Sequence, residues 1–359
     1  MKILVLIIWS FLIVNMSSEI QSPITVENAP HLSEMASWTG EASFISDLMF
    51  NHDGSKLAIV GGRGLIDNGD VILLNPMTLK AVSSTSDPLI ATRIAFSPDG
   101  TLFVTGDESG QITIWQSESF EQIKTIQGAK GRILSIAIDP SNQFVAATFG
   151  SVATGMGGDS IFKIFNIESN SEYLSIKCEN QSASGCDGPY GSAVSFDEQG
   201  QTIYLATSDG RIHAWDVKTL RENILGNDFS QLSYDFTFVK DGVGYITQEG
   251  SIRLLSIDRI SNEPITFPVN KSDTEFPYAL ASHPTEPILA ISYGVNVKDS
   301  PNRDSILRLL NVDTGEVLTT IEISTPQDDP IFSLGFNPDG TLLASGGTDG
   351  TVRLWGVAG

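Results

Sequence analysis

The end of the chain alternates between apolar and polar positions in the way that predicts short β-strands. In the segment 336–357, FNPDGTLLASGGTDGTVRLWGV, Val352 and Leu354 lie on one face of the last strand and Arg353 lies on the other. Turn sequences separate the strands, with Asn-Pro-Asp-Gly at 337–340 and Asp-Gly at 349–350. Three antiparallel strands cannot bury both faces of their sheet alone. The pattern therefore predicts an all-β chain in which similar units pack on one another.

Copies of this unit recur along the chain. Each copy has a turn motif followed by an alternating strand, and the motifs begin at Phe50, Phe96, Ile138, Phe196, Phe238, Ser282 and Phe336. The alternating strands that follow occupy residues 70–74, 111–115, 161–165, 211–215, 251–255, 306–310 and 351–355. Several copies follow one another at close to the roughly 40–45 residues that are typical of four-stranded propeller blades. The repeats therefore predict seven blades.

These repeats resemble the WD40 family over residues 31–359. The clearest copies are FSPDGTLFVTGDESGQITIWQ at 96–116, SDGRIHAWDV at 208–217 and the C-terminal unit, and the Trp-Asp dipeptide stands at Trp215-Asp216. The resemblance implies a seven-bladed β-propeller. The family's Gly-His dipeptide, whose His joins a Ser, an Asp and a Trp in a hydrogen-bonded tetrad, is absent before every unit. We therefore expect stability to rest on strand pairing and apolar packing.

The last unit ends after its third strand, whereas a blade needs four. The segment 31–38 precedes the first unit and has no partner in sequence. The resemblance implies that this N-terminal segment supplies the outer strand of the C-terminal blade and so closes the ring. Closure would remove the open strand edges that promote aggregation.

The first 18 residues read as a secretory signal peptide. Lys2 is the basic region, residues 3–14 form an apolar stretch too short to span a bilayer comfortably, and Ser17 and Ser18 offer a cleavage site. Residues 19–30 follow as a leader, and the propeller begins at residue 31. The alternative is an uncleaved N-terminal anchor that tethers the protein to a membrane. Either reading predicts an extracytoplasmic protein, secreted or periplasmic, with no membrane span after signal cleavage.

The net charge of −22 argues against binding to nucleic acid or anionic lipid, because both need clustered Lys and Arg. Several loops that the resemblance places on one face are long and acidic. They carry Asp67, Asp159, Asp187, Asp299, Asp304, Asp328 and Asp329. These residues are the candidate binding face, and their charge favours a cationic ligand. An acidic chain also has acidic loops without any functional reason, and this alternative stays open.

The chain has two cysteines, Cys178 and Cys186, in one long inter-blade connection. In an exported chain they predict a disulfide. Two free thiols are the alternative if the signal reading is wrong. A zinc site is disfavoured, because the spacing is not Cys-x-x-Cys and no His is near in sequence.

Catalytic motifs are absent from the sequence, and we expect no catalytic residue, cofactor or metal. His213 lies in an alternating strand beside Trp215 and reads as structural, whereas His52 and His283 occupy nearly the same position in the turn motif, away from the long loops. The first hypothesis is a monomeric, non-enzymatic scaffold that binds a protein or peptide through its loops. The alternative is an exported propeller enzyme, a metal-assisted hydrolase or lactonase, with carboxylates at the channel mouth. A calcium site gathered from several loops belongs to this alternative.

Overall fold

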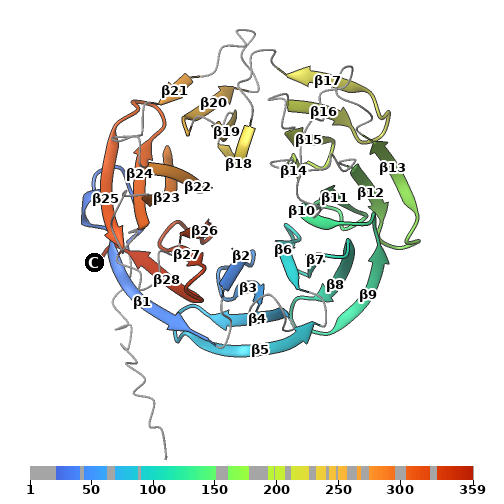
Figure 1. Ribbon diagram of the computed structural model, residues 1–359, viewed down its shortest axis with the longest axis horizontal. Helices are drawn as coiled ribbons and strands as arrows, with labels where there is room; N and C mark the ends of the chain where they lie inside the picture. The colour runs from blue at the N-terminus through green and yellow to red at the C-terminus, as the bar shows by residue number, and fades with distance from the viewer. Residues whose placement is uncertain are drawn as a thin grey trace, which may run out of the picture.

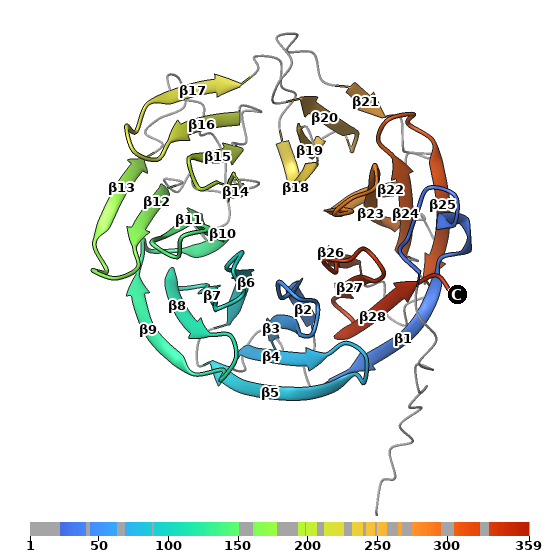
Figure 2. The same ribbon diagram turned by 180° about the vertical axis from the view of Figure 1, so that it is seen from behind.

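A computed structural model shows a closed ring of seven four-stranded antiparallel sheets (Figures 1 and 2). The structure describes residues 22–40, 44–62, 69–87, 90–150, 161–177, 193–197, 199–206, 212–225, 232–239, 242–247, 250–256, 265–267, 275–295, 305–323 and 330–358. The seven sheets confirm the predicted seven-bladed propeller. Among the described residues, no helix has the length and apolar character that crossing a membrane would need.

The blades are numbered in chain order, and their strands are given from the ring axis outward. The first three blades are β2 (Phe44–Phe50), β3 (Leu57–Gly62), β4 (Gly69–Asn75) and β5 (Lys80–Asp87); β6 (Ala91–Phe96), β7 (Leu102–Asp107), β8 (Gln111–Gln116) and β9 (Gln122–Gln127); and β10 (Arg132–Ile138), β11 (Phe144–Gly150), β12 (Ile161–Asn166) and β13 (Glu172–Lys177). The next two are β14 (Ala193–Phe196), β15 (Thr202–Ala206), β16 (Ile212–Asp216) and β17 (Glu222–Leu225); and β18 (Leu232–Val239), β19 (Gly242–Thr247), β20 (Ile252–Ser256) and β21 (Ile265–Phe267). The last two are β22 (Glu275–Ser282), β23 (Ile288–Val295), β24 (Ser305–Asn311) and β25 (Val317–Ile323); and β26 (Ile331–Phe336), β27 (Leu343–Gly347), β28 (Thr351–Gly356) and β1 (Ser33–Thr39).

The apolar positions of the strands fill the spaces between neighbouring blades. One buried cluster joins Ile45 and Leu48 of the first blade to Val352 and Leu354 of the seventh. Other clusters join the first blade to the second and the second to the third in the same way. Each sheet therefore buries both faces against its neighbours, and this is why a single blade cannot be stable alone.

The two ends of the chain meet in the seventh blade. Strand β1 pairs antiparallel with β28, so that Ser37 lies opposite Arg353 and Thr39 opposite Thr351, and β1 forms the outer edge of this sheet (Figure 1). The predicted ring closure is confirmed, with the strand at Ser33–Thr39 and a short 3-10 helix, η1, at Ala29–His31.

The contact between the two ends extends beyond β1. Ser22 forms a bridge with Val357, and the amide of Ile24 donates a hydrogen bond of 2.8 Å to the carbonyl of Gly340. The side chain of Ile24 is completely buried in a cluster with Trp355 and Val357. The boundaries of the signal peptide and the leader stay predictions, because residues 1–21 lie outside the described ones.

Two indole–hydroxyl bonds stabilise the second and seventh blades. Trp115 donates from Nε1 to the hydroxyl of Thr105 at 3.0 Å, and Trp355 donates to the hydroxyl of Ser345 at 2.9 Å. Both bonds are buried and join the third strand of a blade to its second strand. They correspond to the Ser–Trp half of the family's tetrad, for which the sequence offers no Gly-His dipeptide.

Candidate binding face

The predicted site residues cannot be placed on this ring. The seven aspartates of the candidate binding face and both cysteines, Cys178 and Cys186, lie outside the described residues. The acidic face and the disulfide therefore stay predictions. Other parts of both ring faces are formed by residues that the structure describes.

The two faces of the ring are distinguished by the direction of the innermost strands. We call the face on which these strands begin, as at Arg132 and Ile331, the top face. The face on which they end, as at Phe50 and Phe336, is the bottom face.

The innermost strands β2, β6, β10, β22 and β26 each carry a register shift, and the residue after the shift is polar in all of them except β22, where it is Ala279. The shifts lie at Ile45/Asp47, Ala91/Arg93, Ile133/Ser135, Pro277/Ala279 and Ile331/Ser333. A bulge adds one unpaired residue and re-aims the side chains beside it. The bulges therefore repeat at one height of the ring, close to the top face.

Side chains at this height form a belt of hydrogen bonds between neighbouring blades. Ser333 accepts a bond of 3.1 Å from the amide of Leu48, and Asp47 accepts one of 3.0 Å from the amide of Ile94. The same bond recurs at two further junctions, where Ser135 accepts from the amide of Val194 and Asp235 accepts from the amide of Leu280. Buried hydroxyls also donate hydrogen bonds across the junctions. Ser46 donates to the carbonyl of Ala91, Thr92 to that of Ile133 and Ser292 to that of Ile331.

Asp47 lies where three blades meet. Its carboxylate accepts hydrogen bonds from the amides of Leu48 and Ile94 and from the hydroxyl of Ser333, each at 3.0 Å. Burial raises the pKa of Asp47, and the charge of Arg93 and these hydrogen bonds offset part of the rise. The group therefore links the first, second and seventh blades at the seam that β1 closes.

The top face also exposes aromatic rings. Phe276 near the start of β22 is 44% exposed, and Phe332 on β26 is 40% exposed. The ring of Tyr278 meets that of Phe332 edge to face, with centroids 5.3 Å apart. Exposed aromatic side chains are common anchors in protein–protein interfaces. Two adjacent blades thus present an apolar surface at the inner part of the top face.

A buried ion pair supports this aromatic surface. Glu275, which begins β22, accepts two bonds from Arg308 on β24, at 2.6 and 3.0 Å. The guanidinium lies 4.8 Å from the ring centroid of Tyr293, and burial raises the pKa of that phenol. Burial alone would lower the pKa of Arg308, but the hydrogen bond and charge of Glu275 raise it above its ordinary value. The ion pair therefore joins the start of β22 to β24.

Two arginines lie at the top face on the second and third blades. Arg132 begins β10, and Arg93 lies on β6. Arg132 stands six residues before the turn motif of its blade, as Phe276 does in the sixth blade, so the two lie at the same height of the ring. The top face therefore differs around the ring, with aromatic rings on the sixth and seventh blades and cationic groups on the second and third.

The bottom face is built from the turn motifs, which pack against one another. Gly54, Gly100, Gly200 and Gly340 have positive φ values and contact the turn of the preceding blade. A polar residue at the second position of six of the motifs accepts a hydrogen bond from a backbone amide of its own turn. These residues are Asn51, Ser97, Asp139, Asp197, His283 and Asn337.

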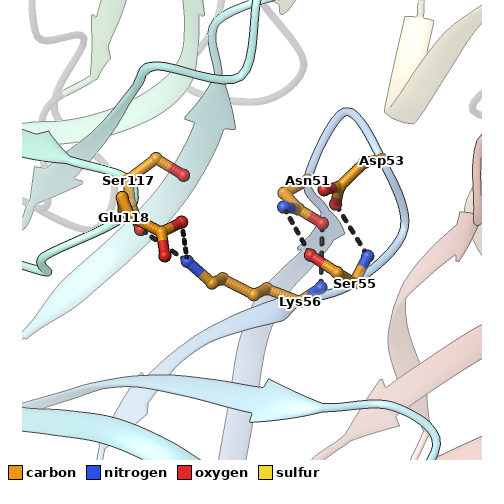
Figure 3. A network of polar contacts seen from close by, with 6 residues as sticks. All are labelled: Asn51, Asp53, Ser55, Lys56, Ser117 and Glu118. Carbon is orange, nitrogen blue, oxygen red and sulfur yellow. Dashed lines mark hydrogen bonds and ion pairs between the residues drawn. The ribbon is translucent and has the colours of Figure 1, made fainter.

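One bottom-face network ties the first blade to the second (Figure 3). Asn51 accepts from the amide of Lys56 at 2.8 Å, and this bond closes the turn from which the Lys56 side chain leaves. The Lys56 ammonium donates to the carbonyl of Ser117 at 3.2 Å and pairs with Glu118 at 2.9 Å. Because Glu118 is largely exposed, the ion pair adds little stability to this junction.

The histidines serve structural roles where the structure describes their contacts. His213 is buried, bonds to Glu222 at 2.6 Å through Nδ1 and stacks on Trp215, in agreement with the predicted structural role. His283 is buried under Gly340 on the bottom face, as the motif position predicted. Among the described residues, no group of three His, Cys, Asp or Glu side chains could hold a metal ion.

The aromatic rings and the arginines of the top face are not among the site residues predicted from the sequence. Phe276 and Arg132 stand six residues before the turn motifs of their blades, Phe332 stands four residues before its motif, and Arg93 stands three residues before its motif. Sequence alone could have identified Phe276, Phe332, Arg93 and Arg132 as inner-strand positions. It could not have shown that the two rings are exposed, since exposure depends on the neighbouring blade.

Comparisons with known proteins agree with the fold. The model of the family described as WD domain, G-beta repeat matches residues 79–116, 120–166 and 315–356. The chain is similar to actin-interacting protein 1 of Drosophila melanogaster, with 23% identity over 305 residues, which cover 83% of this chain and 46% of that protein. It is also similar to eukaryotic translation initiation factor 3 subunit I of Saccharomyces cerevisiae, with 20% identity over 325 residues, 77% of this chain and 92% of that one.

A shorter similarity covers part of the ring. The small ribosomal subunit protein RACK1 of Candida albicans is 26% identical over 126 residues, 35% of this chain and 37% of that protein. The match therefore spans less than half the length of both the Drosophila and the Candida protein. The matched repeats and the ring of sheets together identify the chain as a seven-bladed β-propeller that carries WD40 repeats.

Proposed function

We propose that this protein is a non-enzymatic scaffold that binds a protein or peptide partner through its top face. The single observation that carries the proposal is the exposure of Phe276 and Phe332 on adjacent blades of a closed ring. Exposed aromatic rings on a rigid support lose little conformational entropy when they bind. The partner would place apolar side chains against these rings.

The similar proteins support a binding role. Their names describe one as interacting with actin and others as subunits of a translation factor or a ribosomal subunit. Those partners belong to the similar proteins. The apolar N-terminal stretch of this chain, at 3–14, supports an extracytoplasmic setting. We propose that the ring acts there as a monomer. The acidic loops, including Asp299 and Asp328, would add a site for a cationic part of the partner.

Affinity capture from the extracytoplasmic fraction tests the proposal. The wild-type chain is compared with Phe276→Ser/Phe332→Ser and with the control Met77→Ser, which removes an apolar side chain that is 51% exposed at the turn between β4 and β5. We expect a partner that the wild type and the control retain and that the double variant loses. Equal capture by all three, or capture by none, contradicts the proposal.

The enzyme alternative has a test of its own. Calcium added to the purified chain should leave its melting temperature unchanged if the protein is a scaffold without a metal site. A calcium-dependent rise in melting temperature, with no captured partner, would favour the hydrolase or lactonase reading, because an ion that binds the folded state stabilises it.

A further inference from the structure

The top face carries two arginine side chains that no carboxylate pairs with directly. Arg308 and Arg353 each form an ion pair, with Glu275 and Asp349. Arg132 and Arg93, in contrast, form none with any residue that the structure describes. In a chain with 43 acidic and 21 basic residues, an arginine without an acidic partner is unexpected on charge numbers alone. The buried carboxylate of Asp47 feels the charge of Arg93, and the exposed carboxylate of Glu108 feels that of Arg132, but neither carboxylate forms an ion pair with its arginine.

Arg93 is held in place by backbone carbonyls. Its Nε atom donates to the carbonyl of Leu134 at 2.6 Å, across the junction to the third blade, and its Nη1 atom donates to the carbonyl of Thr92 at 2.8 Å. The Nη2 atom has no partner among the described residues. Arg93 is thus oriented before any ligand binds, with donor capacity left over.

Arg132 has still more unused donor capacity. Its side chain is half-buried and forms no hydrogen bond with the described part of the chain, and its buried Nε atom lacks a partner there. Burial and the charge of Arg93 lower the pKa of Arg132, and the exposed carboxylate of Glu108 offsets only part of this effect. An unpaired, partly buried charge beside a like charge is costly, and a bound anion would relieve the cost.

The segment that leads to Arg132 is fixed by close packing. The amide of Gly128 donates to the carbonyl of Gly110 at 3.0 Å. A Cβ atom on Gly110 would lie 1.8 Å from the carbonyl oxygen of Ala129, so only glycine fits there, with φ at 85°. The backbone before β10 is therefore anchored to the second blade, and Arg132 begins from a defined position beside Arg93.

We propose that Arg132 and Arg93 form an oxyanion subsite on the top face, which binds a carboxylate or phosphate group of the partner. Guanidinium groups bind both oxyanions through paired, charge-assisted hydrogen bonds. The inference rests on the proposed function and adds to it a subsite of charge opposite to that of the predicted acidic loops. A partner that uses both would carry an anionic and a cationic group.

Calorimetric titration with inorganic phosphate at constant ionic strength tests the subsite directly. We expect saturable binding to the wild type and binding weakened about tenfold or more in Arg132→Gln, since a charge-assisted hydrogen bond is lost. Arg132→Lys should fall between the two, because it keeps the charge but not the paired geometry. The control Arg221→Gln removes the same charge from an exposed turn between β16 and β17 and should bind as the wild type does. Absent binding to the wild type, or equal affinity in Arg132→Gln, overturns the proposal.

Acetate titrated in the same way separates the two sources of the anion. Phosphate binding that far exceeds acetate binding supports a phosphate-bearing partner, and comparable binding supports an acidic side chain. These titrations do not use the partner, so they decide on the subsite even if affinity capture fails. Conversely, if capture succeeds and phosphate does not bind, the scaffold proposal stands and the subsite does not.

Discussion

Ser333 on β26 donates a hydrogen bond of 3.0 Å to the carboxylate of Asp47 on β2, although 286 positions separate the two residues in the chain. The bond crosses the junction between the last blade and the first, where the ring closes. Ser333 also accepts from the amide of Leu48, so that one hydroxyl joins the two inner strands twice. The closure of the propeller is thus secured at its inner edge as well as at its outer edge by β1.

The inner bond can be measured by a double-mutant cycle. Asp47→Ala leaves the amide of Ile94 unpaired and should lower the free energy of unfolding by about 1–3 kcal/mol. With Ser333→Ala, the cycle should give a coupling energy of at least about 0.5 kcal/mol in denaturant unfolding. Asp47→Ala combined with Ser135→Ala, on another junction, is the control and should be additive. Additivity in both cycles would show that the bond does not contribute to stability.

The outer closure predicts a strong effect at the N-terminus. Deleting residues 19–38 removes nearly all of β1 and the buried Ile24, and leaves β28 as an open edge. We expect a clearly lower melting temperature and aggregation of the shortened chain. The single change Ile24→Ala should cost about 2–5 kcal/mol of unfolding free energy, as for other large-to-small core substitutions. Val82→Ala, at a 55% exposed position, should cost almost nothing, and an unchanged melting temperature after the deletion would contradict ring closure.

His283 predicts a loss of stability at mildly acidic pH. Its Nδ1 atom accepts from the amides of Thr285 and Glu286, so the proton lies on Nε2, which donates to the carbonyl of Gly340 at 3.1 Å. Burial lowers the pKa of His283 more than the hydrogen bond to Gly340 and the charges of Glu286 and Asp339 raise it. Its contribution to stability is therefore complete above the unfolded-state pKa of about 6.5 and is lost as the pH falls from there toward the lower folded-state pKa.

The test compares the pH dependence of unfolding in two variants. His283→Asn keeps an acceptor for the turn amides, as Asn51 and Asn337 do at the same position, and should flatten the loss of stability between about pH 7 and pH 5. His52→Asn, which changes an exposed histidine of the first turn motif, is the matched control. If both variants follow the wild type, His283 is not the titrating group.

The ion pair of Glu275 and Arg308 predicts opposite results for single and double substitution. Arg308→Met removes the guanidinium that pairs with the buried Glu275 carboxylate and should cost about 3–5 kcal/mol of unfolding free energy. Adding Glu275→Gln should recover a large part of this loss, because the buried negative charge is then removed as well. Chemical denaturation of the wild type and the three variants measures both effects. A double variant no more stable than Arg308→Met would show that lost packing, not the buried charge of Glu275, causes the loss of stability.

The predicted disulfide can be checked by intact-mass analysis of the purified mature protein. If Cys178 and Cys186 are joined, the protein should be two hydrogens lighter before reduction than after it, and a small loop of this size should add about 2–3 kcal/mol of stability, less any strain. Cys178→Ser should show no such mass change on reduction. Free thiols in the exported protein would contradict the disulfide. The mass also shows whether residues 1–18 have been removed.

Much of the architecture could be predicted from the sequence, because it depends on local chemistry. The turn motifs and the alternating strands are short-range signals, and the unpaired segment before the first repeat indicated the closing strand. The strand lies at Ser33–Thr39 and not at the predicted residues 31–38, since pairing with β28 determines where β1 begins and ends. The candidate site was harder to predict. Its exposed rings, Phe276 and Phe332, look like ordinary strand residues until the neighbouring blades are in place.

The sequence by itself determined the number of blades, the turns between strands and the need for a closing strand, because these follow from periodicity and from the conformational preferences of Gly, Pro, Asp and Asn. Only the tertiary structure decided which polar side chains link blades and which face outward. Asp47 and Arg93 occupy equivalent positions in adjacent repeats, yet one accepts hydrogen bonds at a junction of three blades and the other donates to a backbone carbonyl of the third blade. That difference arises from neighbours far away in the chain, which local sequence cannot specify.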